Sequence, residues 1–471
     1  MISIIFRKAS RWIFFAALAY APWAYGATTS DSINVTNCVL LVALGFWGAE
    51  LLTSRRRLRL PRYLIILTGA LICIGGWMAL NARSIYDPEF SLFVPLRTLV
   101  PFLPGSVDYA NSVAWMLRGA LLLATILFVS DLSQSSRWLL RLWYVISLIG
   151  GSIAFLGLLQ KATGAQMIFW QPPPPPEFGV TTFFATYFYH GNAGAFLNLA
   201  WPLSAGLVIR AFSTRGQAGM RALWTLVFIV TIAGVLANTS RMAQVVALVM
   251  LVAIGLHFGP GLLRRLPGAQ KSVAVAGALA IALALIALAQ ASHLEQSLNR
   301  WQSVSEHLPT DARWQASRVA LSVLPVAGFF GFGPATFRVV FPGYNIGSGH
   351  AVPGSWRFLH QDYLQTVMEW GWLGSSLWAL LFFGGIAVGI LSYKRYAARD
   401  WMPRRRFMQP LAIVALAGVA MHALVDFPFQ IESTQLYIAT YLGVCWGSSL
   451  WNDKSEIRRH TSETGIRTEH C

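Results

Sequence analysis

The chain has 471 residues, of which 55% are hydrophobic and only 12% are charged. A soluble globular protein has about 25% charged residues, so this composition excludes an ordinary soluble protein and indicates an integral membrane protein. The net charge of +17 is no evidence for a nucleic-acid partner, because most basic residues lie in connections between apolar segments, where they set membrane orientation.

Twelve apolar segments are long enough to cross a bilayer as α-helices, which predicts an all-α polytopic membrane protein. The first segment has the charge pattern of a signal peptide. No convincing small-residue cleavage site follows it, however, and we interpret it as a membrane helix. The predicted spans are residues 12–27, 35–53, 63–82, 111–131, 138–159, 190–210, 220–238, 242–258, 272–291, 371–392, 408–425 and 433–451.

The connections between these spans alternate in charge, and one set holds most of the 36 basic residues. Because Lys and Arg accumulate on the cytoplasmic side, we expect both termini to be cytoplasmic. The chain then divides into spans one to nine (1–291), a large outer loop (292–365), spans ten to twelve (366–451) and a cytoplasmic tail (452–471). The other basic residues lie on the outer side or within the membrane, against this bias: Arg83, Arg97, Arg118, Lys161, Arg241, Arg300, Arg313, Arg318, Arg338 and Arg357.

The four cysteines are too few and too badly placed for a disulfide framework, since three lie inside apolar runs and the fourth is the last residue. No CxxC or HExxH spacing is present, so we expect neither a bound metal nor another cofactor. A run of five prolines at residues 172–176 predicts a stiff polyproline II segment in an outer loop.

Two arginines at the outer ends of spans are candidates for binding an anion. Arg118 lies about 10 Å inside the fourth span, where an arginine either meets an anion or snorkels to the surface. Arg241 follows Thr239 and Ser240 at the start of the eighth span. Hydroxyl caps and the helix dipole favour an anion there, although an interfacial anchor would explain the arginine equally well.

The outer loop contributes a third arginine, on a predicted helix from Asp311 to Leu324. Arg313 and Arg318 both lie on this helix, but they do not share a face. Arg318 is expected to stack on Trp314, four residues earlier, so we assign the anion-binding role to Arg313.

His360 is the candidate general base, because it lies at the start of a predicted helix whose dipole disfavours the imidazolium. Asp362, in the first turn, either suits the helix dipole or orients the imidazole ring. His190 and the pair His422 and Asp426, spaced four residues apart, are weaker candidates for the same chemistry. Any of these histidines can instead be purely structural.

Three glycines at residues 328, 331 and 333 predict a tight turn in the outer loop. No strand precedes them and no Lys-Ser/Thr pair follows, so they do not form a phosphate-binding loop for a nucleotide. Their expected role is to let the backbone turn sharply.

The order of these motifs resembles that of the O-antigen ligase and polymerase superfamily of bacterial membrane glycan transferases. The resemblance covers about residues 180 to 450, and each motif is loose by itself. The matching segments are His190-Gly-Asn192-Ala-Gly-Ala-Phe-Leu, Thr239-Ser240-Arg241, Asp311-Ala-Arg313-Trp314, Gly331-Phe-Gly333-Pro334-Ala-Thr-Phe337, His360-Gln-Asp362-Tyr363-Leu364, Glu369-Trp-Gly371 and Val425-Asp426-Phe427-Pro428.

This resemblance implies a GT-C-like fold of the bacterial inner membrane and a metal-independent, inverting glycosyltransferase whose active site is periplasmic. Its donor would be a glycan on undecaprenyl diphosphate. Arg241 and Arg313 would bind the diphosphate, and His360 would deprotonate the acceptor hydroxyl. Arg118 lies outside the matching segments, and we add it to the diphosphate site only because an arginine inside the membrane is costly without an anion. Supporting positions would be His190, Asn192, Asp362, Tyr363 and Asp426.

Several functions remain open. A ligase would use lipid A–core as acceptor and a polymerase would use a second lipid-linked glycan; the dominance of one outer loop favours the ligase. Exopolysaccharide polymerisation and protein O-glycosylation use related chemistry. A transporter or flippase would instead show ionisable residues near the midplane of several helices and two related halves, and the sequence shows neither.

Overall fold

A computed structural model describes residues 2–54, 56, 58–172, 182–213, 218–265, 311–348, 352–354 and 356–453. These residues contain 13 α-helices, a few short 3-10 turns and one two-stranded antiparallel sheet. The prediction of an all-α protein is therefore confirmed, with a small hairpin added. The predicted ninth span (272–291), most of the proline run and nearly all of the tail lie outside the described residues.

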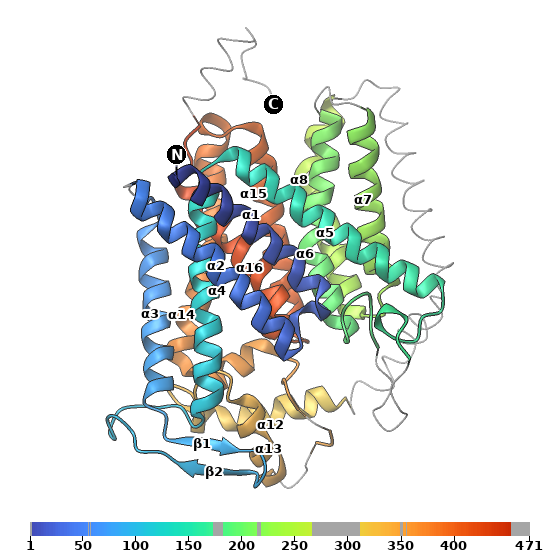
Figure 1. Cartoon of the computed structure of the whole chain (residues 1–471). Helices are drawn as coiled ribbons and strands as arrows, with labels where there is room; N and C mark the ends of the chain where they lie inside the picture. Colours follow the sequence, from blue (N-terminus) through green and yellow to red (C-terminus); the bar gives the residue numbers. More distant parts are fainter. Residues whose placement is uncertain are drawn as a thin grey trace.

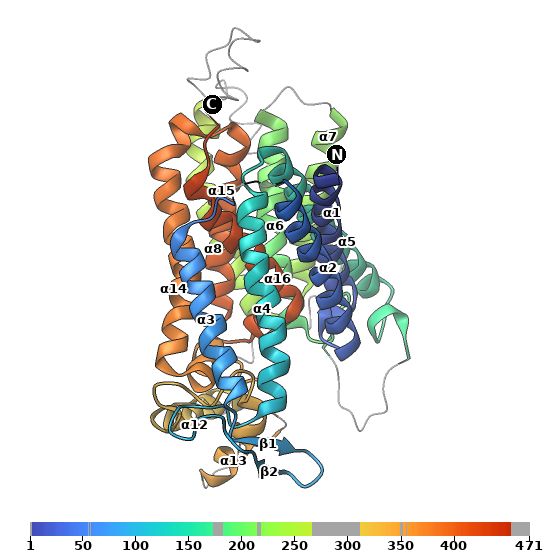
Figure 2. The ribbon, with the colours of Figure 1, turned by 60° about the vertical axis from the view of Figure 1, so that its left-hand side comes forward.

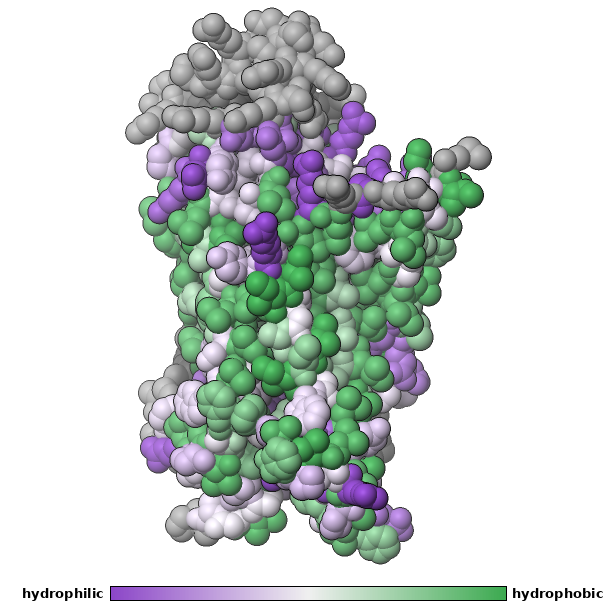
Figure 3. Space-filling model, turned by 90° about the vertical axis from the view of Figure 1, so that its left-hand side faces the viewer, coloured by the Kyte–Doolittle hydropathy of each residue, from purple (hydrophilic) through white to green (hydrophobic). Residues whose placement is uncertain are grey.

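Among the described helices, 8 are long and apolar enough to cross a membrane. This confirms a polytopic membrane protein, and Figure 3 shows a hydrophobic band across the middle of one face with hydrophilic residues toward both ends. These helices are α2 (Ser30–Ser54), α3 (Arg62–Leu80), α4 (Tyr109–Leu132), α5 (Ser136–Ala162), α6 (His190–Ser213), α7 (Ala218–Ala237), α8 (Arg241–Arg265) and α14 (Asp362–Asp400).

Three more predicted spans coincide with α1 (Ile2–Trp23), α15 (Pro403–His422) and α16 (Glu432–Gly447). Helix α16 is buried along its whole length and runs through the centre of the bundle in Figures 1 and 2. Because it faces other helices rather than lipid, it can carry polar residues such as Ser433 and Thr440, which are fully buried. Helix α1 begins ten residues before its predicted span.

Basic segments that the charge pattern placed on one side meet at one end of the bundle. Arg7 and Arg56 both pair with Glu50, at 2.7 and 3.1 Å, and Arg56 also pairs with Asp131 at 2.7 Å. The start of α1 lies at this end (Figure 1). Arg405 joins them, since its guanidinium donates to the carbonyl groups of residues 133 and 134, beside the end of α4.

The opposite end carries a layer of short elements outside the bundle: α12 (Ala312–Ala327), α13 (Phe337–Gly347), β1 (Ser84–Asp87) and β2 (Leu92–Pro95) (Figures 1 and 2). The two strands pair with Ser84 opposite Pro95, a hairpin that the sequence analysis did not predict. Helices α12 and α13 have a small apolar core of their own, in which Ala320, Val323 and Phe341 are buried against Met368 of α14.

The predicted glycine turn joins this layer to α14. Gly331 and Gly333 have positive φ angles, and the backbone N–H groups of Phe332 and Gly333 donate to the carbonyls of Met368 and Glu369. Gly371, with φ 60°, interrupts α14 at this contact. A Cβ on Gly331 would collide with the backbone at Gly371, and a Cβ on Gly371 would collide with the backbone at Gly331. The first turns of α14 are thereby fixed to the outer layer.

Candidate functional site

Asp426, in the loop between α15 and α16, is the centre of a cluster of polar side chains. Its Oδ1 lies 3.1 Å from Nδ1 of His360 and also accepts the backbone N–H of Phe427 at 3.1 Å. Its Oδ2 accepts the Tyr189 hydroxyl at 3.1 Å and lies 3.6 Å from Nε2 of His422. The predicted pairing of His422 with Asp426 is therefore present, and His360 shares the same carboxylate.

The carboxylate of Asp426 is ionised in this setting. Burial by itself would raise its pKa, but the hydrogen bond with His360 and the positive charges that His360 and His422 carry when protonated outweigh burial and hold that pKa well below its usual range. Arg313 extends the cluster, because its guanidinium donates to the Tyr189 hydroxyl at 2.9 Å. Burial by itself would lower the pKa of Arg313. Tyr189 and Asp426 outweigh burial and raise that pKa, so this arginine stays charged.

His360 is held in one orientation by the residues around it. It directly precedes Gln361, the N-cap of α14, and its backbone has the left-handed conformation, with φ 60°. The ring meets Phe427 edge-on at a centroid distance of 4.5 Å, and its side chain is 21% exposed. Because Nδ1 faces a carboxylate, that nitrogen carries the proton and Nε2 is left as the basic nitrogen, the arrangement a general base needs.

The motif His190-Gly-Asn192 at the start of α6 explains how the chain approaches Asp426 so closely. A Cβ at Gly191 would collide with Oδ2 of Asp426 and with the Tyr189 ring. His190 itself is fixed elsewhere, with Nδ1 2.5 Å from the Thr182 hydroxyl. In this motif the glycine provides the space and the histidine anchors the preceding loop.

Replacing Gly191 by alanine should therefore destabilise the protein by about 1–3 kcal/mol, because the added methyl group displaces Asp426 or Tyr189. Thermal unfolding in detergent would measure the effect. Gly255→Ala in α8 is the matched control, since a Cβ there meets nothing within 4 Å. Equal melting temperatures for the two variants would contradict the close approach.

A cavity of about 810 Å³ opens beside His360 at the end of the bundle that carries the outer layer. Its lining includes three arginines, Arg118 of α4, Arg338 of α13 and Arg357 of the segment before α14, together with the carboxylate of Glu369. The cavity is therefore cationic, and many neutral hydrogen-bonding groups surround it. Among these groups are Asn34, Asn37, Asn111, Asn192, Gln365 and Gln430.

The structure brings four of the predicted residues to this place. His360, Arg118 and Asn192 line the cavity, and Asp426 contacts Nδ1 of His360. Arg118 forms an ion pair with Glu432 at 3.0 Å, so its charge is partly balanced inside the protein. Arg313 joins the same cluster through the Tyr189 hydroxyl, without being one of the described residues that line the cavity.

Arg241 lies beside this group at the start of α8. The predicted cap is present, because Ser240 accepts the backbone N–H of Ala243 at 3.3 Å. The Asn238 amide donates to the carbonyl of His190 at 2.8 Å, which places the start of α8 against the start of α6. Arg241 is not among the described residues that line the cavity.

Asp362 and Tyr363 connect the start of α14 to the residues on either side of the loop that carries Asp426. The carboxylate of Asp362 is fully buried and accepts the backbone N–H of Phe429 at 2.8 Å and the Gln430 amide at 3.1 Å. The Tyr363 hydroxyl donates to the carbonyl of Ala420 at 2.8 Å. Asp426, and not Asp362, therefore orients the ring of His360. Orienting this ring was one of the two roles predicted for Asp362 from its position in the first turn.

Three site residues were not identified from the sequence as such. Tyr189 links Arg313 to Asp426, and its only signal was its place directly before a predicted motif. Arg338 and Arg357 were among the arginines that run against the charge bias, which was a usable signal. The predicted stacking of Arg318 on Trp314 is present, with the guanidinium 5.8 Å from the ring centroid, and it keeps Arg318 on the outer face of α12.

No protein-family model matches the sequence, and no curated protein is significantly similar to it. The function of the protein is therefore inferred from the geometry of these residues and from the motif order.

Proposed function

We propose that this protein is a membrane glycosyltransferase of the O-antigen ligase and polymerase type, with a GT-C-like fold. The observation that carries the proposal is the His360–Asp426 pair at the edge of a cationic cavity. An oriented neutral imidazole is suited to take a proton from a hydroxyl, and guanidinium groups are suited to hold a phosphate leaving group. Both are present within one site at the end of the bundle opposite the start of α1.

In the proposed reaction, Nε2 of His360 removes the proton of the acceptor hydroxyl as its oxygen attacks the anomeric carbon of the donor sugar. The new glycosidic bond forms as the bond from that carbon to the diphosphate oxygen breaks, so the configuration inverts. The proton stays on His360, where the Asp426 carboxylate stabilises the imidazolium. The leaving diphosphate takes the electron pair, and the site's arginines stabilise its charge.

We assign the donor as a glycan on undecaprenyl diphosphate and the acceptor as lipid A–core, with a second lipid-linked glycan as the alternative for a polymerase. The orientation that fits these substrates has both termini in the cytoplasm and the cavity facing the periplasm of a bacterial inner membrane. The alternating charge of the connections supports this orientation.

The deciding experiment uses the purified protein, a lipid-diphosphate glycan and one acceptor at a time. Product on lipid A–core would identify a ligase, and a lengthening ladder on the carrier lipid would identify a polymerase. No transfer to either acceptor would contradict the assignment and leave a transporter as the function to test next.

Transfer should continue in the presence of EDTA, because arginines rather than a metal ion are proposed to neutralise the leaving group. We expect the rate with excess EDTA to stay within roughly twofold of the untreated rate, a change too small for a lost Lewis acid. The measurement is the initial rate with and without chelator. A loss that added Mg²⁺ or Mn²⁺ restores would overturn the metal-independent mechanism.

A further inference from the structure

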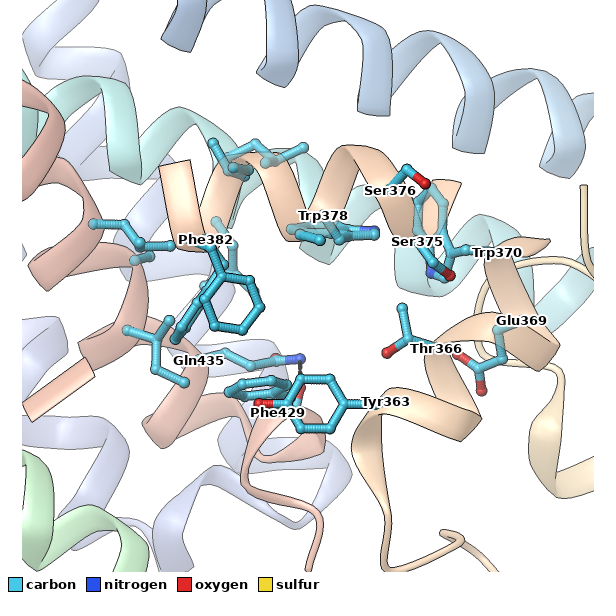
Figure 4. A pocket seen from close by; sticks show the side chains of 18 of the residues that line it. Tyr363, Thr366, Glu369, Trp370, Ser375, Ser376, Trp378, Phe382, Phe429 and Gln435 are labelled. Atoms are coloured by element: carbon cyan, nitrogen blue, oxygen red, sulfur yellow. Dashed lines mark hydrogen bonds between the residues drawn. The ribbon is translucent and has the colours of Figure 1, made fainter. Parts of the chain in front are cut away.

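A second cavity, of about 390 Å³, adjoins the cationic cavity and is lined mainly by apolar side chains. It lies between α4, α14 and α16, and Figure 4 shows Trp370, Trp378 and Phe382 of α14 on its wall. Trp115, Glu369 and Gln430 line both cavities. The two spaces therefore meet at these three side chains.

The cationic side is built to receive an anion. The guanidinium of Arg338 donates to the amide oxygen of Asn111, and that of Arg357 lies over the Phe358 ring at 5.6 Å. Within the described chain neither arginine forms an ion pair with a carboxylate. Partial burial, and then the positive charges of Arg338 and Arg118, lower the pKa of Arg357. Two arginines that pair with no carboxylate in the described chain, close to a third arginine, favour an anionic ligand.

The carboxylate of Glu369 at the junction is already engaged. Its Oε1 accepts the backbone N–H of Phe337 and the Gln365 amide, both at 3.2 Å. Glu369 is 4% exposed, so its charge is held back from the cavity by its own donors. Glu369 therefore fixes the wall between the two cavities. Arg338 and Arg357 line the cationic cavity and are exposed.

The apolar side runs from the arginines toward the middle of the membrane. Arg118 lines the cationic cavity, whereas Leu122, Leu123 and Ile126 on the same helix line the apolar one. From Arg118 to Ile126 the axis of α4 rises about 12 Å. The ligand that fits both spaces therefore has an anionic head and a long apolar chain that begins beside it.

We propose that the two joined cavities hold a single lipid diphosphate, with its diphosphate among Arg118, Arg338 and Arg357 and its first hydrocarbon units between α4, α14 and α16. This inference rests on the proposed function and deepens it. It adds Arg338 and Arg357 to the diphosphate site and assigns the place of the lipid chain. Because His360 lines the same cationic cavity, a sugar attached to this diphosphate lies in the space next to the base.

The test measures binding of two probes to the purified full-length protein, inorganic pyrophosphate and a long-chain polyprenyl diphosphate. The double variant Arg338→Gln/Arg357→Gln should weaken both by at least about tenfold, because it removes two charge-assisted contacts. Arg318→Gln is the matched control, an arginine of the same outer layer that stacks on Trp314.

The chain site is tested by Ala379→Trp, which fills the apolar cavity from α14, with Leu380→Trp as control. Ala379 lines that cavity, whereas its neighbour Leu380 is not among the described residues that line it. Ala379→Trp should weaken the polyprenyl diphosphate by about tenfold, the effect of losing roughly two buried methylene groups, and leave pyrophosphate unchanged. Equal affinity of the wild-type protein for both probes would overturn the lipid part of the proposal.

Binding and transfer together separate the two proposals. If the double arginine variant bound both probes as the wild-type protein does, this inference would be overturned. Normal glycan transfer by that variant would also overturn it, but would leave the proposed function intact. Binding as expected without transfer to any acceptor would support the lipid site and overturn the transferase. Melting temperatures of all variants, compared with their controls, exclude losses caused by misfolding.

Discussion

Replacing His360 by alanine or asparagine should reduce glycan transfer by about 10²- to 10⁴-fold, the usual contribution of a general base. Asparagine is the sharper variant. It tolerates the left-handed backbone at this position better than alanine does, and its amide can still donate to Asp426. Loss in both variants would therefore reflect the missing basic nitrogen rather than a distorted loop. The measurement is the initial rate of transfer with purified substrates.

The matched control for this prediction is His257→Ala. His257 lies on α8, where its ring contacts Tyr393 and Phe258 far along the helix from the site. This variant should transfer glycan at the wild-type rate. If His360→Asn kept more than about a tenth of wild-type activity, a loss smaller than a general base explains, His360 would be a structural residue and the base would have to be sought elsewhere.

The sequence predicts the membrane helices well, because a long apolar run in a bilayer has few alternatives to a helix. Helix α16 was predicted as a span even though it contains Ser433, Thr434 and Thr440, which it can carry because it is surrounded by protein. The hairpin of β1 and β2 was missed because it is too short to give a clear alternating pattern. Gly371 interrupts α14 because the turn at Gly331 packs directly on it, a contact between residues forty positions apart.

The site was predictable in its residue types but not in its pairings. His360, Arg313 and Asp426 were all identified, yet the sequence analysis named Asp362 for the His360 ring and paired Asp426 with His422. Local reasoning favours a residue two positions away, whereas the contact joins residues 66 positions apart. Tyr189 illustrates the same limit, because its bridging role exists only once α6, α12 and the loop after α15 have come together.

The buried position of Asp426 makes it the second decisive residue, acting through His360 rather than on the substrate. In Asp426→Asn the amide can present its NH₂ to Nδ1 of the ring. The imidazole proton then moves to Nε2, so the nitrogen that faces the substrate can no longer accept a proton. We expect transfer to fall by about 10²- to 10⁴-fold, the range for general-base catalysis, although the side-chain volume is unchanged.

A purely structural role for Asp426 would give a different result. Loss of the tautomer lowers kcat and leaves the KM for the lipid-linked donor nearly unchanged, whereas a collapsed site would raise KM and lower the melting temperature. Asp87→Asn in the hairpin is the control, because Asn can accept the same two turn hydrogen bonds from residues 89 and 90. Since one carboxylate orients His360, accepts Tyr189 and lies beside His422, a kcat-only effect would show that orienting the base is its main contribution to the reaction.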